Sequence, residues 1–284
     1  MFHLDLADRF VSRSLLRGSY GLAEIERARS FLDGGSRVLV VGAHIGAIAI
    51  PLSKHCRQLV AIEPNPDTYA SLEINVALNQ CSNMTVHNVA ANDRREALQF
   101  VMNTHNSGGS KRMPRLRHPA YFYDDPRVIE VAGVPLDDFL DPPDFDLVFM
   151  DIEGSEYFAF LGMQRILAKA ATLIVEFLPH HLTRVAGVSV DEFLRPLLPH
   201  FDLLTVPSIG VDCNKETFLP TLNALFAGGR GDAGIIFRKT GCDFGKGRTT
   251  TSASARKFTM IPVNFQDRLG HVIPDGGICG SRRP

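Results

Sequence analysis

Short apolar runs alternate with stretches of helical periodicity along the first part of the chain. Residues 37–41 and 58–62 are almost entirely apolar, which is typical of strands that are buried on both faces of a sheet. Residues 48–55 and 67–79 repeat apolar positions at helical spacing, and residues 84–88 are predicted as a third strand. Because crossovers between such strands are right-handed, this strand–helix–strand–helix–strand series predicts a parallel α/β sheet.

A long polar excursion interrupts the series. Residues 98–101 and 128–131 are predicted as two short strands that bracket it, and an amphipathic helix at residues 20–32 is predicted ahead of the first strand. The alternation then resumes and predicts a strand at 146–150, a helix at 156–170, and strands at 172–177, 203–206 and 233–238.

These boundaries divide the chain into three predicted parts. Residues 1–35 form a helical lead-in, and residues 36–240 form one α/β domain. Residues 241–284 are predicted as a partly disordered tail, because their composition shifts to Gly, Ser, Thr and Arg. Within the domain, residues 103–127 are predicted as a lid or recognition loop, since long polar loops in α/β enzymes tend to be functional.

Charge and cysteine content exclude several classes of protein. The chain carries 30 basic and 31 acidic residues, a formal net charge of −1, so no overall field draws it to nucleic acid or anionic lipid. No run approaches the roughly 20 apolar residues of a membrane span, and the start lacks a signal-peptide pattern. The 5 cysteines show no paired spacing. We therefore expect a reduced, cytoplasmic protein that binds neither nucleic acid nor membrane.

The strongest chemical signal is VLVVGAHIG followed by VAIEPNP. Gly42 and Gly46 allow backbone turns that a side chain would forbid, although a tight turn alone would also explain them. Glu63 ends the next strand, where an acid accepts hydrogen bonds from the ribose hydroxyls of an adenosine group. His44 stands where a pyrophosphate-binding G-x-G-x-x-G motif has its middle glycine. The pattern therefore favours S-adenosylmethionine over a nicotinamide cofactor.

A second signal is the cluster of Asp151, Glu153 and Glu156 between a strand and a helix. Ligands of open α/β sheets lie over the carboxyl ends of the strands, so Asp151 is expected to point into the site. Acids near a helix start also stabilise its dipole, which is the alternative role for Glu153 and Glu156. Clustered carboxylates suit Mg²⁺ or Ca²⁺ as well. Capping and site acids are the commoner reason for such clusters, and we predict no metal.

Several segments together resemble the FkbM-type methyltransferase family, over roughly residues 36–178. The matching segments are GAHIG, AIEPNPDTYASLEINVALN, NVAAND, VFMDIEGSEYFAFLGMQRIL and LIVEF. The resemblance implies a Rossmann-like class I methyltransferase fold, with a mostly parallel seven-stranded sheet flanked by helices. It also implies methyl transfer from S-adenosylmethionine, typically to a hydroxyl of a sugar or secondary metabolite. Many members carry Asn where this chain has His44.

The resemblance extends to individual residues. It implies that Gly42, Ala43 and Gly46 line the cofactor, that Glu63 holds the ribose, and that residues 88–92 border the adenine. The complete set predicted to bind cofactor is Gly42, Ala43, His44, Gly46, Glu63, Pro64, Asn65, Ala90 and Asp151.

A hydroxyl nucleophile loses its proton as it attacks a methyl group, so we expect a base within hydrogen-bond reach. Asp151 is the first choice for this base and Glu153 is the alternative. The Lys/Arg cluster of residues 103–127 would suit an anionic acceptor such as a phosphorylated or nucleotide-linked sugar, although a solvated basic loop has the same composition. The alternative functions are a catalytically silent binding module and a nucleotide-dependent oxidoreductase. The oligomeric state stays open.

Overall fold

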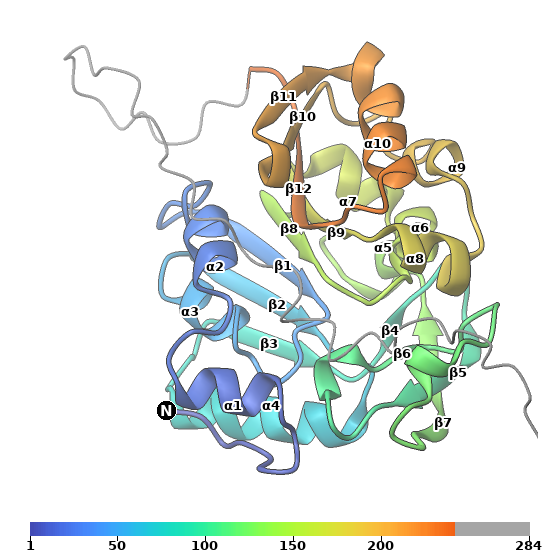
Figure 1. Cartoon of the computed structure of the whole chain (residues 1–284). Coiled ribbons are helices and arrows are strands. Elements are labelled where there is room, and N and C mark those ends of the chain that lie inside the picture. The colour runs from blue at the N-terminus through green and yellow to red at the C-terminus, as the bar shows by residue number, and fades with distance from the viewer. Residues whose placement is uncertain (242–284) are drawn as a thin grey trace, which may run out of the picture. The chain divides into compact units, whose positions relative to one another are not determined.

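The computed structural model describes residues 1–241, in which two sheets form (Figure 1). The predicted tail at 241–284 lies outside the described residues, apart from residue 241. The main sheet has eight strands in the order β11-β10-β12-β9-β8-β1-β2-β3. Their bounds are β1 (Arg37–Val41), β2 (Gln58–Ile62), β3 (Met84–His87), β8 (Leu147–Met150), β9 (Thr172–Phe177), β10 (Leu203–Val206), β11 (Val211–Asn214) and β12 (Asp232–Arg238).

The main sheet corrects the predicted seven-stranded arrangement. Strands β3, β2, β1, β8 and β9 are parallel, as the alternating pattern predicted. Strand β12 runs antiparallel between β9 and β10, and β11 adds an eighth strand by pairing antiparallel with β10. The pattern did not reveal β11, because its four residues are partly polar and no residue of it is buried. The sheet is therefore mixed and has eight strands.

The polar excursion forms a second sheet that the sequence did not predict. Its order is β4-β7-β5-β6, with the bounds β4 (Ala90–Ala91), β5 (Glu96–Met102), β6 (Lys111–Arg112) and β7 (Arg127–Val134). The predicted strands at 98–101 and 128–131 are the central parts of β5 and β7, which pair antiparallel over seven residue pairs. Leu98, Phe100 and Val131 belong to its own small apolar core.

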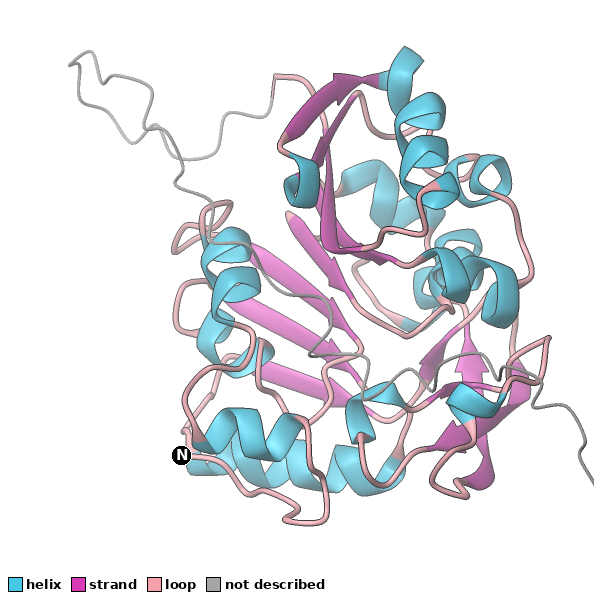
Figure 2. Cartoon of the chain, viewed as in Figure 1, coloured by secondary structure: helices cyan, strands magenta, loops and turns pink. Residues whose placement is uncertain are grey.

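Helices cover both faces of the main sheet (Figure 2). Alternate residues of β1 point in opposite directions, as a strand requires. Val38 and Val40 pack with α2, α3 and α4, while Leu39 and Val41 belong to the core that contains the helices on the other face. The bounds are α2 (Leu22–Arg29), α3 (Ala49–Ser53), α4 (Pro66–Leu78), α5 (Leu136–Phe139), α6 (Glu156–Leu161), α7 (Gln164–Lys169), α8 (Pro179–His181), α9 (Val190–Leu194) and α10 (Phe218–Ala227).

The predicted helix at 156–170 is two helices, α6 and α7, which are separated by Gly162 and Met163. A Cβ on Gly162 would lie 1.9 Å from the carbonyl oxygen of Asn92 and 3.1 Å from Cα of Pro135. The chain therefore needs glycine where α6 ends, because the residues that flank the second sheet pack directly against it.

The N-terminal residues run along α4 before they reach α1 (Val11–Leu16) (Figure 1). Asn75 on α4 donates a hydrogen bond of 3.2 Å to the carbonyl of His3, and the backbone N–H of Arg9 donates to the carbonyl of His105. This segment therefore contacts the long loop between β5 and β6. No helix within residues 1–241 has the length and apolar character that a membrane crossing needs.

Candidate functional site

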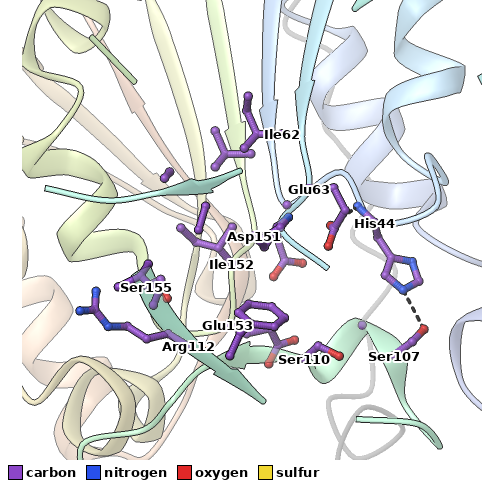
Figure 3. A pocket seen from close by; sticks show the side chains of 18 residues that line it. His44, Ile62, Glu63, Ser107, Ser110, Arg112, Asp151, Ile152, Glu153 and Ser155 are labelled. Carbon is purple, nitrogen blue, oxygen red and sulfur yellow. Dashed lines mark hydrogen bonds between the residues drawn. The ribbon is translucent and has the colours of Figure 1, made fainter. Parts of the chain in front are cut away.

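One pocket lies where β1, β2 and β8 end and the second sheet approaches them (Figure 3). It opens to solvent. Parallel strands bring their carboxyl ends to the same edge of a sheet, so residues distant in sequence meet here. The pocket is the candidate functional site.

The glycine turn after β1 is fixed by its own packing. The backbone N–H groups of Gly42 and Ala43 both donate to the carbonyl of Ile62 at 2.9 Å. Gly42 has φ +86°, and a Cβ there would lie 1.9 Å from the carbonyl oxygen of Asp151. Gly46 has φ +91° and packs against α4 through Leu72. Gly42 is therefore required because its backbone lies against the end of the neighbouring strand β8. Gly46 is required for packing against α4.

Glu63 places a buried carboxylate in the pocket at the end of β2. Its Oε2 accepts the backbone N–H of His44 at 2.8 Å, and its Oε1 accepts that of Asn65 at 2.9 Å. Burial raises the pKa of Glu63 to about 7, although both N–H bonds act in the opposite direction. The Asn88 side chain donates to the carbonyls of Glu63 and Pro64, which holds this strand end in place.

His44 connects the glycine turn to two distant segments. Its φ of +51° is unusual for a residue with a side chain, and its ring Nε2 lies 2.7 Å from Ser107 Oγ (Figure 3). Ser107 gives its only hydroxyl proton to the Asp8 carboxylate, so His44 Nε2 must be the donor to Ser107. Burial lowers the pKa of His44 to about 4, which keeps the ring neutral. Sequence reasoning missed Asp8 and Ser107, although Ser107 lies in the predicted recognition loop.

The three acids after β8 have different environments. Asp151 and Glu153 line the pocket. The Glu156 Oε1 accepts the backbone N–H groups of Ile152 and Gly154 at 3.2 Å, so this residue closes the turn before α6 and does not line the pocket. The capping role that the sequence left open for Glu153 and Glu156 thus applies to Glu156.

Glu153 is held by two residues from other elements. Its Oε2 lies 2.8 Å from Lys111 Nζ and 3.3 Å from His181 Nε2. Glu153 itself has φ +56°, a conformation that non-glycine residues adopt mainly where surrounding contacts enforce it. Lys111 is only 4% exposed and Glu153 is partly exposed, so the two form a partly buried ion pair at the edge of the pocket. Sequence reasoning did not select Lys111 individually.

A further acid extends this cluster. His181 Nδ1 lies 3.3 Å from Glu176 Oε2, and burial lowers the pKa of His181 to about 4. Ligand atoms of Glu153, Glu176 and His181 lie within 4.8 Å of one another, so these residues have the spacing that a metal ion would need. The Glu153 oxygen that lies near His181, Oε2, is also in contact with the Lys111 ammonium. The predicted absence of a metal stays a prediction.

The predicted cofactor residues divide into two groups. Those that line the pocket are Gly42, His44, Glu63, Pro64, Ala90 and Asp151. Ala43, Gly46 and Asn65 are outside its lining, and the Asn65 side chain instead caps α4 by accepting the N–H groups of Asp67 and Thr68. The lining residues that the sequence did not predict as site residues are mainly from the second sheet and its loop, namely Leu98, Phe100, Ser107, Gly108, Ser110 and Arg112. The predicted recognition loop therefore does border the pocket.

Comparisons with known proteins agree with the resemblance found in the sequence. A model of the methyltransferase FkbM domain matches residues 41–204. A methyltransferase FkbM from Methylobacillus flagellatus KT has a similar structure, with 18% sequence identity and a TM-score of 0.44, covering 82% of this chain and 56% of that chain. This chain therefore spans little more than half of that protein's length. No protein of curated function gives a significant match.

Two further solved structures are similar at low identity. An rRNA methylase from Streptococcus thermophilus shares 8% identity at a TM-score of 0.43, covering 76% of this chain and 94% of that chain. A precorrin-6y C5,15-methyltransferase from Geobacter metallireducens GS-15 shares 14% identity at a TM-score of 0.43, covering 84% of this chain and 94% of that chain.

Proposed function

Because this chain belongs to the FkbM methyltransferase family, we propose that it transfers a methyl group from S-adenosylmethionine to a hydroxyl of a sugar or another small molecule. The observation that carries the proposal is the pocket at the ends of β1, β2 and β8, with a buried carboxylate directly after β2 and a second carboxylate after β8. Its residues Gly42, His44, Glu63 and Asp151 come from the two chemical signals in the sequence.

The residues of the pocket fit an adenosyl group. Each oxygen of Glu63 accepts one backbone N–H, and a carboxylate oxygen has a second lone pair that can accept a ribose hydroxyl. Ala90, Ala91 and Leu98 add apolar surface to the lining of the pocket, which suits the faces of an adenine ring. We assign Glu63 to the ribose and this apolar surface to the adenine.

When bound, S-adenosylmethionine supplies a methyl group that is already electrophilic. The residues of the chain then have two tasks, which are to align the acceptor hydroxyl and to take its proton. Asp151 lines the pocket next to Glu63 and is our first assignment for the base (Figure 3). Glu153 is the alternative, but one of its oxygens already contacts Lys111 and His181. That contact makes Glu153 better suited to hold the acceptor than to receive its proton.

Calorimetric titration with S-adenosylmethionine, S-adenosylhomocysteine and NAD tests the cofactor assignment. We expect micromolar binding of the two adenosyl ligands alone, and at least tenfold weaker binding by Glu63→Ala, since a charged acceptor contributes about 1.5–3 kcal/mol. Equal binding of NAD, or no binding of either adenosyl ligand, would contradict the proposal.

The acceptor class is tested by incubating the protein with radiolabelled S-adenosylmethionine and a panel of sugars, sugar phosphates and hydroxylated metabolites. We expect label to transfer to a hydroxyl oxygen, and transfer to fall at least 100-fold in Asp151→Asn, the usual scale for a general base. Transfer that survives nearly unchanged in this variant excludes Asp151 as the base.

A further inference from the structure

Arg112 lies at the side of the pocket opposite His44 (Figure 3). Figure 3 shows Arg112 there, beside Ser155 and Glu153. The Arg112 guanidinium carbon lies 3.9 Å from the centre of the Phe158 ring, and that of Arg115 lies 5.6 Å from the centre of the same ring. One buried aromatic ring therefore carries two guanidinium groups.

The loop that follows β6 lies against the segment that carries a third arginine, Arg184, whose side chain hydrogen-bonds Tyr121. The backbone N–H of Leu116 donates to the carbonyl of Arg184 at 2.9 Å, and the N–H of Arg115 donates to the carbonyl of Val185 at 3.4 Å. Arg115 also lies against Gly187, where a Cβ would be 2.7 Å from its Cδ. The stem of Arg115 is thus held by packing. We call Arg112, Arg115 and Arg184 the arginine rim.

The charge of the arginine rim is only partly balanced. Arg112 lies 3.8 Å from Glu96 and donates to Asn92 at 3.0 Å. Within residues 1–241, no carboxylate lies within ion-pair distance of Arg115 or Arg184. Placing like charges together costs free energy; burial chiefly lowers the pKa of Arg112, and Arg115 lowers it slightly, while Glu96 and Asp93 raise it. A bound anion would offset that cost.

A fourth cation, Lys111, is paired with Glu153 beside the pocket. Lys111 lies 5.0 Å from the centre of the Tyr121 ring, and the Tyr121 hydroxyl donates to the carbonyl of His180. The pKa of His180 is lowered to about 3, chiefly by burial and then by His181 and Lys111, while Glu153 acts in the opposite direction. A negative group bound by Arg112 would therefore lie beside Glu153, whose charge is paired with that of Lys111 (Figure 3).

We propose that the arginine rim binds a phosphate group of the methyl acceptor, so that the acceptor is a phosphorylated or pyrophosphate-linked small molecule. Guanidinium groups match phosphate oxygens through paired, charge-assisted hydrogen bonds, and aromatic packing holds their planes ready for such contacts. The proposal rests on the proposed function, because it assigns one end of the same pocket to the acceptor.

The test uses inorganic pyrophosphate as the probe in calorimetric titrations of the full chain, with and without S-adenosylhomocysteine. We expect one saturable site that is retained when S-adenosylhomocysteine is bound. Arg115→Gln and Arg184→Gln should each weaken pyrophosphate binding roughly tenfold, as the loss of a charge-assisted contact at a partly exposed site predicts. Both variants should bind S-adenosylhomocysteine normally.

Arg57→Gln is the matched control. Arg57 is exposed, and it precedes β2 at the opposite edge of the sheet from the pocket. The substitution therefore removes the same charge at a site far from the rim. The proposal is overturned if pyrophosphate does not bind, if it competes with S-adenosylhomocysteine, or if the rim variants lose no more affinity than the control. Failure of S-adenosylhomocysteine alone to bind, with pyrophosphate binding intact, would instead refute the proposed function and with it the acceptor assignment.

Two further probes separate possible sources of the anion. Malonate carries two carboxylates, and equal binding of malonate with the same arginine dependence would replace the phosphate by a carboxylate. A short single-stranded RNA carries many phosphates, and binding that is over 100-fold tighter than that of pyrophosphate would overturn the assignment to a small acceptor. We expect pyrophosphate to bind at least tenfold more tightly than malonate, because each of its phosphates offers more oxygens to the guanidinium groups.

Discussion

Glu63 is the residue whose chemistry depends most directly on its burial. Burial raises its pKa to about 7 from 4.5. Ribose hydroxyls donate to the ionised carboxylate, so protonation removes one of the two acceptors. We expect the affinity for S-adenosylhomocysteine to fall as the pH drops through 7, by at most about tenfold per pH unit. Calorimetric titrations at pH 8.5, 7 and 6 measure this directly.

The control for that pH dependence is Glu63→Gln, which should bind weakly and equally at all three pH values. An affinity in the unchanged protein that stays constant from pH 8.5 to 6 would mean that Glu63 does not bind the ligand as a carboxylate.

Lys111 supplies the positive charge in the buried cluster around Glu153. Removing one partner of a buried ion pair leaves the other charge without compensation, and this typically costs about 3–5 kcal/mol. We therefore expect Lys111→Met to lower the free energy of unfolding by that amount in urea denaturation. Lys54→Met, at an exposed lysine, should cost less than about 1 kcal/mol.

A double variant, Lys111→Met with Glu153→Gln, should recover much of the lost stability, because it removes both charges. If Lys111→Met costs no more than Lys54→Met, the contact between Lys111 and Glu153 is not a significant source of stability.

Sequence reasoning identified the pocket residues that directly follow strands and missed those that meet through folding. Gly42, Glu63 and Asp151 were predictable because strand ends follow from the local apolar pattern. The contacts of Ser107 with His44 and Asp8 join residues 63 and 99 positions apart. Local patterns contain no information on such pairs.

At the scale of elements, Asp124 organises the loop between β5 and β6. Its carboxylate accepts the backbone N–H groups of Thr104 and His105 and the side chain of Asn103. Burial acts to raise the pKa of Asp124, but these hydrogen bonds stabilise the charged form, and the pKa is lowered overall. Asp124→Asn should loosen this loop, which contributes Ser107 to the pocket.

We expect Asp124→Asn to weaken S-adenosylhomocysteine binding about tenfold, the effect of losing one such charged contact. Hydrogen exchange should be faster at residues 103–110. Asp125→Asn removes the same charge at the neighbouring exposed position and should leave both quantities unchanged. Equal behaviour of the two variants would contradict this role of Asp124.

Element boundaries were predictable wherever local composition determines them. The strands at 58–62, 172–177 and 203–206 have the predicted bounds. The prediction of one continuous helix at 156–170 was wrong. Its interruption at Gly162 depends on contact with Asn92 and Pro135, which the sequence does not reveal.

At the scale of the whole molecule, ligand binding should stabilise the fold. A ligand that binds only the folded state at 100 times its Kd adds about 2.7 kcal/mol. For a domain of this size each kcal/mol corresponds to roughly 2–4 °C, so S-adenosylhomocysteine should raise the Tm by about 5–10 °C. Differential scanning calorimetry measures the shift, and NAD serves as the control ligand. An equal shift with NAD would contradict an adenosyl-sulfur site.

The α/β class was predictable from the alternation of strands and helices, and the second sheet was not. Strands β5 and β7 are separated by the whole recognition loop, and their pairing depends on that loop folding back. The eighth strand of the main sheet is short and lies at an edge, where apolar pattern is weakest.

The position of β12 has a practical consequence for fragments of this protein. The matched family domain ends at residue 204, inside β10, while β12 lies between β10 and β9. A fragment that stopped there would leave the long edge of β9 without its neighbour, and an open apolar strand edge is a template for association between chains. A soluble fragment must therefore extend through residue 238, so the region recognised by similarity is shorter than the region that folds.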